Sequence, residues 1–192
     1  MTTPVSTGDR VPLAAPSSFA GSFAGLSLDR PRLMAVINVT PDSFSDGGEA
    51  FALDDAVARG RAFIAEGADI LDIGGESTRP GADPVSAEEE IRRVVPAVEA
   101  AASMGAAVSI DTRRAGTMEA ALQAGAGIVN DVSALRYDPR SAELVAKTGC
   151  PVVLMHAPGS GNDLHDGGTY ESVMFDVFDA LRERRDAAVA AG

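Results

Sequence analysis

Residues 105–131 read GAAVSIDTRRAGTMEAALQAGAGIVND and predict a complete strand–helix–strand unit. The short apolar runs at 108–110 and 128–129 are typical of strands that are buried on both faces. Between them, residues 114–124 have the helical period, and Gly125 follows as a helix-ending residue because glycine accepts the left-handed conformation. The stretch therefore predicts a βα repeat with parallel strands.

The same pattern extends in both directions along the chain. Further apolar runs lie at 33–37, 70–73 and 152–155, and further helical segments at 53–66, 87–104, 139–147 and 170–190. Gly67, Gly105 and Gly149 also follow helical segments, and Pro96 predicts a bend or a short break in its helix. Five such units predict an α/β fold, either an open doubly wound sheet or a (β/α)₈ barrel.

The strand ends favour the barrel. In a barrel the carboxyl ends of all strands meet at one mouth, whereas an open sheet gathers them only where the strand order reverses. Loop capping is the alternative at any single position, because Asn and Asp often cap loops. Each expected strand ends in a polar residue, namely Asn38, Asp72, Asp111, Asn130 with Asp131, and His156.

The first 25 residues are rich in Pro, Ser, Thr, Gly and Ala, and predict a flexible N-terminal arm. The expected globular domain covers residues 26–192.

Composition excludes several classes of function. The formal net charge of −12 opposes broad binding to nucleic acid. No apolar run reaches the length of a membrane span, and no secretory signal is evident. The single Cys150 cannot form an internal disulfide, so a cytoplasmic location is expected.

Two polar loops contain the most distinctive residues. Residues 38–48 read NVTPDSFSDGG, with an exposed Phe44 that is costly unless it packs on something. Residues 74–81 read GGESTRPG, in which Ser77, Thr78 and Arg79 together can bind an oxyanion. Both loops are expected to cover the mouth of the barrel.

These loops strongly resemble the two signatures of dihydropteroate synthase. The segments SIDT at 109–112, IVNDV at 128–132 and VLMH at 153–156 match in order and spacing, so the resemblance covers about residues 26–191. It implies a TIM-type (β/α)₈ barrel and a transferase of folate biosynthesis. That enzyme joins 6-hydroxymethyl-7,8-dihydropterin diphosphate to p-aminobenzoate, which sulfonamides mimic, and releases diphosphate.

The resemblance implies a role for several strand-end residues. Asn38 corresponds to the Mg²⁺ ligand beside the diphosphate. Asp111 and Asn130 correspond to hydrogen-bonding partners along the edge of the pterin, with Val132 and Met155 as its apolar bed. Mg²⁺ is thus the implied cofactor, and a neutral amide oxygen is a reasonable ligand for it.

The remaining implied residues lie in the two loops. Thr78 corresponds to a contact with the diphosphate and with the aminobenzoate side, and Phe44 and Pro80 to walls of the aminobenzoate pocket. Asp46 and Arg79 belong to the loops that close over the reacting centre, and are the expected catalytic residues. Asp72 is expected to orient its neighbours, and His156 to have a structural role.

The chain also departs from this family. It ends after about five βα units, without the later Asp-Pro-Gly, Lys-Ser and Arg-x-His segments, so a truncated barrel of doubtful activity is expected. A homodimer is implied only for the full-length parent. Two alternatives stay open: a non-catalytic truncated paralogue, and a pterin-binding methyltransferase barrel.

Overall fold

The computed structural model describes residues 21–39, 48–76, 85–159 and 167–192, and within 48–52 the backbone only. Most of the expected N-terminal arm therefore lies outside the described residues. At its end, β1 (Ser22–Phe23) and β2 (Leu26–Ser27) form a small antiparallel hairpin that sequence reasoning missed. The turn between them has positive φ at Ala24 (50°) and Gly25 (77°), which is typical of two-residue hairpins.

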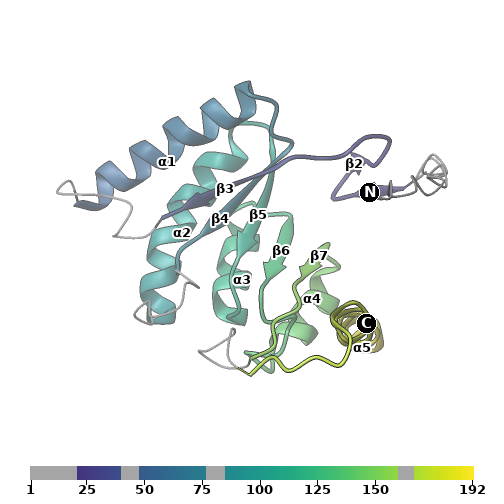
Figure 1. Cartoon of the computed structure of the whole chain (residues 1–192). Helices are drawn as coiled ribbons and strands as arrows, with labels where there is room; N and C mark the ends of the chain where they lie inside the picture. The colour runs from purple at the N-terminus through teal and green to yellow at the C-terminus, as the bar shows by residue number, and fades with distance from the viewer. Residues whose placement is uncertain (1–20, 40–47, 77–84, 160–166) are drawn as a thin grey trace, which may run out of the picture.

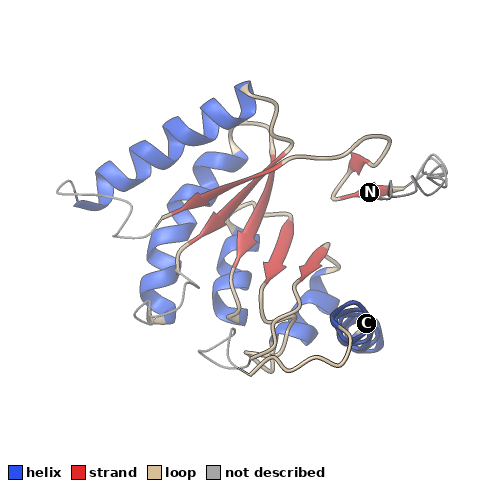
Figure 2. Cartoon of the chain, viewed as in Figure 1, coloured by secondary structure: helices blue, strands red, loops and turns tan. Residues whose placement is uncertain are grey.

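The main sheet contains five parallel strands in sequential order, as Figures 1 and 2 show. They are β3 (Met34–Asn38), β4 (Ile70–Gly74), β5 (Ala107–Asp111), β6 (Ile128–Asp131) and β7 (Val152–Leu154). The order has no reversal, so the doubly wound alternative is wrong. Consecutive parallel strands in this order form an arc of a (β/α) barrel.

Five helices alternate with these strands. They are α1 (Gly48–Ala65), α2 (Ala87–Ala102), α3 (Ala115–Gln123), α4 (Ser141–Thr148) and α5 (Val173–Ala191). The four glycines expected to end helices, Gly67, Gly105, Gly125 and Gly149, all have positive φ, as predicted. None of the described helices is long and apolar enough to cross a membrane.

Helix α2 shows how tertiary packing overrides a local signal. Ser86 accepts a hydrogen bond from the backbone N–H of Glu89 (3.2 Å) and caps the helix. The break expected at Pro96 is absent, because α2 is continuous from Ala87 to Ala102. Its buried face, which includes Val94 and Val98, packs in the core and offsets the lost backbone hydrogen bond.

The core lies on one face of the sheet. Ile37, Ile73, Ile110 and Val129 are Cα partners across β3 to β6, and all four belong to the core cluster. Because side chains alternate along a strand, the intervening residues face the other way. Figure 1 shows α1 to α4 along one side of the sheet and α5 beside β7.

The amino-terminal end of the sheet is fastened by Asp69. Its carboxylate accepts hydrogen bonds from Arg30 (2.6 and 3.0 Å), Arg32 (3.1 Å) and the backbone N–H of Leu33 (2.9 Å). These contacts, with that of Arg30 the largest, lower the pKa of Asp69. They hold the segment before β3 against the residue that precedes β4.

Gly75 gives a test of the close approach between β4 and α2. A Cβ there would lie 2.7 Å from Val94 Cγ1 and 3.1 Å from Glu90 Cγ, so Gly75→Ala must shift the Val94 side chain or α2 itself. We expect Gly75→Ala to lower the free energy of unfolding by about 1–3 kcal/mol in chemical denaturation. Gly127→Ala is the matched control, because a Cβ at Gly127 meets nothing within 4 Å. Equal stability of the two variants would contradict the packing.

Candidate active site

Four residues form a row across the carboxyl end of the sheet. Asn38 pairs in register with Gly74, Gly74 with Asp111, and Asp111 with Asn130. Paired residues of parallel strands point to the same face, and this face is the one opposite the helices. The structure thus brings together three residues that the sequence predicted for the site, Asn38, Asp111 and Asn130.

Gly74 leaves an open space in this row. A Cβ at this position would lie 3.2 Å from Asn38 Oδ1 and 3.7 Å from Asp111 Oδ2. A side chain here would therefore fill the gap between the amide oxygen and the carboxylate. The gap gives a ligand access to both groups at once.

Asp111 has an unusual electrostatic environment. Burial, followed by the negative charges of Asp72, Asp131, Glu90 and Glu76, raises its pKa to about 7. Among the residues that the structure describes, none donates a hydrogen bond to its carboxylate. The carboxyl group is thus poised between its neutral and charged forms near neutral pH, where it could serve as a donor or as an acceptor.

Asp72 lies one row below and contacts Asn130. The amide Nδ2 of Asn130 donates to Asp72 Oδ2 (3.0 Å), across the intervening strand β5. Burial raises the pKa of Asp72, and the hydrogen bond from Asn130 opposes that rise. The contact leaves the amide oxygen of Asn130 as an acceptor and agrees with the orienting role expected for Asp72.

A buried ionic cluster lies beside the end of β4. Arg114 donates to both oxygens of Glu76 (2.8 and 3.0 Å), to Glu90 Oε2 (2.8 Å) and to the carbonyl oxygen of Val85 (2.8 Å). Arg113 Nε also donates to Glu76 (3.1 Å). Burial alone would raise the pKa of Glu76, but the bonds from Arg114 and Val85 lower it.

This cluster was not predicted as part of the site. Glu90 lies in the acidic first turn of α2, yet only 1% of it is exposed and it pairs with Arg114. The sequence feature that could have indicated this cluster is the pair of arginines directly after a buried strand, because buried cations require anionic partners. The cluster joins Glu76 to Val85, the residues on either side of 77–84.

Some of the other predicted residues lie in the described part of the chain, and the rest lie outside it. Met155 follows β7, and its backbone N–H donates to the carbonyl oxygen of Asp131 (3.4 Å), close to Val132 in the chain. His156 Nε2 lies 3.0 Å from the Tyr170 hydroxyl, a structural contact. Six predicted residues lie outside the described part of the chain: Phe44, Asp46, Ser77, Thr78, Arg79 and Pro80.

The described residues also limit what kind of metal could bind. They contain no group of three or more His, Cys, Asp or Glu side chains that could hold a metal ion. Asn38 beside the Gly74 gap offers one neutral oxygen, which suits Mg²⁺ that keeps water and substrate oxygens as its other ligands. One neutral oxygen is compatible with a hard cation whose other ligands are not protein side chains.

The chain is similar to known proteins over most of its length. A family profile described as "Pterin binding enzyme" matches residues 34–192. A dihydropteroate synthase of Mycobacterium leprae (strain TN) is 49% identical over 168 residues, which are 87% of this chain and 59% of that protein.

The chain is also similar to solved structures of the same family. A Xanthomonas albilineans dihydropteroate synthase with 4-aminobenzoic acid has 50% identity and a TM-score of 0.80, over 88% of this chain and 60% of that one. A Yersinia pestis dihydropteroate synthase with a sulfonamide drug has 43% identity and a TM-score of 0.78, over 87% and 61%. The chain thus spans about 60% of the length of these relatives. The matches confirm the resemblance carried by the two loops.

Asp111 gives a pH-dependent prediction. Because its pKa is raised to about 7, the folded chain keeps this proton where the unfolded chain has lost it, and stability falls as the pH rises from about 4 to 7. Asp111→Asn removes the titration. The free energy of unfolding of Asp111→Asn, relative to that of the parent chain, should therefore rise by about 2–3 kcal/mol between pH 5 and pH 8.

Asp69→Asn is the control with the opposite sign. The pKa of Asp69 is lowered, so the stability it contributes is complete above about pH 5 and is lost only at lower pH. The difference in free energy of unfolding between Asp69→Asn and the parent chain, measured by urea denaturation, should stay constant between pH 5 and pH 8. A difference for Asp111→Asn that is equally flat would show that Asp111 is not perturbed in this way.

Proposed function

The chain belongs to the family of pterin-binding enzymes, and on that premise we propose that it serves the dihydropteroate synthase reaction. In this reaction the amine of p-aminobenzoate displaces diphosphate from 6-hydroxymethyl-7,8-dihydropterin diphosphate. The observation that carries the proposal is the row of Asn38, Asp111 and Asn130 around the Gly74 gap. Its groups face away from the helices, at the end of the sheet where barrel enzymes hold their substrates.

The pterin would be read by Asp111 and Asn130. A pterin edge presents both N–H donors and ring acceptors, so a protein must offer the complementary pattern. Asn130 offers its amide oxygen because Asp72 holds its amide nitrogen. Asp111 offers a carboxyl group with no described partner of its own, and Val132 and Met155 supply apolar contacts to the ring.

The bond-breaking step fits the charge of this site. As diphosphate departs, positive charge develops on the exocyclic methylene and spreads into the pterin. An ionised Asp111 would stabilise that charge, and Asp72, Asp131, Glu76 and Glu90 contribute to the same negative field. The arylamine is already nucleophilic, so holding it near the methylene supplies much of what the second substrate needs.

Mg²⁺ is proposed as the cofactor, with Asn38 as its protein ligand. When bound, it would neutralise charge that develops on the diphosphate leaving group. Asn38 Oδ1 borders the Gly74 gap and is a hard neutral oxygen, as such a metal requires. The protein contributes the position of this oxygen, and the substrate contributes the anionic ligands.

The aminobenzoate side of the site is proposed from the relatives. One solved relative holds 4-aminobenzoic acid and another holds a sulfonamide drug. By the loop resemblance, Phe44 and Pro80 would form the walls of this pocket. Thr78 would contact the diphosphate, and Asp46 and Arg79 would act at the reacting centre. A cytoplasmic location, and a homodimer for the full-length parent, are part of the same proposal.

Titration calorimetry with two pterins tests the assignments. The phosphorylated substrate, 6-hydroxymethyl-7,8-dihydropterin diphosphate, should bind more tightly with Mg²⁺ than without it. Asn38→Ala should abolish this gain, roughly tenfold or more, and leave the affinity for unphosphorylated 6-hydroxymethyl-7,8-dihydropterin unchanged. Asn130→Ala is the matched variant, and should weaken both pterins by a similar factor regardless of Mg²⁺.

The outcomes separate the parts of the proposal. No measurable binding of either pterin to the parent chain would overturn the function. A full Mg²⁺ effect in Asn38→Ala would overturn the metal assignment alone. Unchanged affinity in Asn130→Ala would remove that amide from the pterin site.

A further inference from the structure

Asp131 is a buried carboxylate that the proposed chemistry does not use for binding. Its side chain is fully buried, at the end of β6. One oxygen accepts from the backbone N–H and the hydroxyl of Ser133 (both 2.7 Å), and the other from the backbone N–H of Leu135 (3.0 Å). All of these donors belong to the turn that follows β6.

That turn is strained. Ala134 and Leu135 are consecutive non-glycine residues with positive φ, at 52° and 60°. Side chains disfavour this conformation because Cβ approaches the following carbonyl oxygen, so two such residues in a row need external support. Both are buried, and the Asp131 carboxylate binds the backbone on both sides of Ala134. The carboxylate thus supports the strained turn, together with the backbone hydrogen bond from Ala134 N–H to the carbonyl oxygen of Asp131 (3.0 Å).

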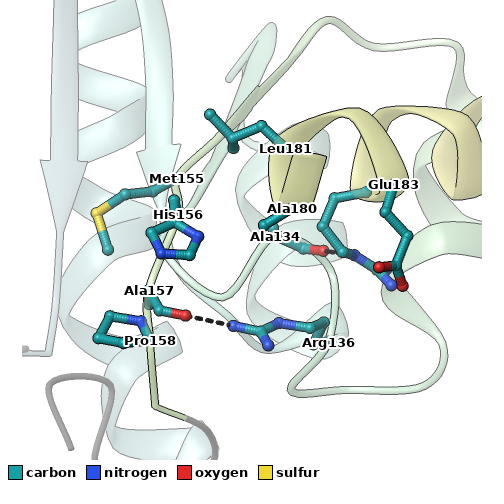
Figure 3. A pocket seen from close by; sticks show the side chains of 10 residues that line it. Ala134, Arg136, Met155, His156, Ala157, Pro158, Ala180, Leu181 and Glu183 are labelled. Carbon is teal, nitrogen blue, oxygen red and sulfur yellow. Dashed lines mark hydrogen bonds between the residues drawn. The ribbon is translucent and has the colours of Figure 1, made fainter. Parts of the chain in front are cut away.

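Through Arg136, this turn also contacts the segment after β7. Figure 3 shows Arg136 reaching from the turn to the backbone carbonyl oxygen of Ala157, at 3.0 Å, and its Nη2 also donates to Gly159 (3.3 Å). Arg184 of α5 donates to the carbonyl oxygen of Ala134 (3.0 Å). These groups surround a pocket of about 180 Å³ that Met155 also lines.

We infer that Asp131 is a positioning residue for the pterin site. By holding the turn, it sets the place of Arg136, and Arg136 sets the segment that contains Met155, two residues before Ala157. The same turn begins with Val132, two residues after Asn130. Asp131 thus fixes the ends of β6 and β7 relative to each other. The functional part of this inference rests on the proposed pterin binding by Asn130, Val132 and Met155.

The carboxylate is needed because three donors meet on its two oxygens. Asn at this position would keep the size, but its NH₂ group would face a donor from Ser133 or Leu135. One support of the turn would be lost without a cavity being formed. We expect Asp131→Asn to weaken binding of 6-hydroxymethyl-7,8-dihydropterin by about tenfold to a hundredfold.

A rescue variant separates positioning from general damage. Ala134→Gly relieves the left-handed strain, because glycine adopts positive φ without a steric cost. Added to Asp131→Asn, it should recover most of the lost affinity, while alone it should change the affinity less than twofold. Asp69→Asn is the control for stability, because Asp69 fastens the opposite end of the sheet and should not alter pterin affinity.

Amide hydrogen exchange tests the coupling without a ligand. Asp131→Asn should speed exchange at residues 132–136 and also at 155–159, by about tenfold, with α2 unchanged. Exchange that changes only at 132–136, or unaltered pterin affinity in Asp131→Asn, would overturn the inference. Lack of rescue by Ala134→Gly would overturn the role of strain. If the parent chain binds no pterin, the proposed function fails, and exchange at 155–159 decides the coupling by itself.

Discussion

The parallel register of the five-stranded sheet is the constraint on which the other features depend. Register places Ile37, Ile73, Ile110 and Val129 on one face, where the helices bury them. The same register places Asn38, Gly74, Asp111 and Asn130 on the other face. A shift by one residue in any strand would exchange an apolar core side chain for a polar group of the row, so folding free energy and site geometry are set by one alignment.

Burial of many carboxylates near one strand end has an electrostatic cost, and the chain compensates for most of it. Glu76 and Glu90 are paired with Arg114, and Asp131 is hydrogen-bonded by the turn after β6. Asp72 receives the amide of Asn130. Burial, followed by the nearby negative charges, raises the pKa of Asp111 to about 7, and no described group of the row compensates for this. A cationic or hydrogen-bonding ligand would relieve this cost, so the instability of the free site favours occupancy.

Much of the fold could be predicted from the sequence, because strand periodicity, helix-ending glycines and polar strand ends are local signals. The βα alternation and the row of Asn38, Asp111 and Asn130 follow from them. The pairing of Arg114 with Glu90 could not be predicted, since the sequence shows which charges exist and not which ones become buried together. The break considered at Pro96 does not occur for a related reason: a helix that is fixed by core packing tolerates a residue that would break an isolated one.

Asn130 and Asp131 show how one strand end can perform two tasks. They are adjacent, so their side chains point to opposite faces of β6. Asn130 lies beside Asp72 on the face of the sheet opposite the helices, and Asp131 lies on the helix-covered face under the strained turn. A neutral amide suits the face opposite the helices, because it can donate to Asp72 and still offer an acceptor to a ligand. A carboxylate suits the covered face, because only an acceptor can satisfy the three donors of that turn. The order Asn-Asp therefore follows from the contacts on the two faces. In the reverse order, position 130 would have no donor for Asp72, and position 131 would place an NH₂ group against a donor of the turn.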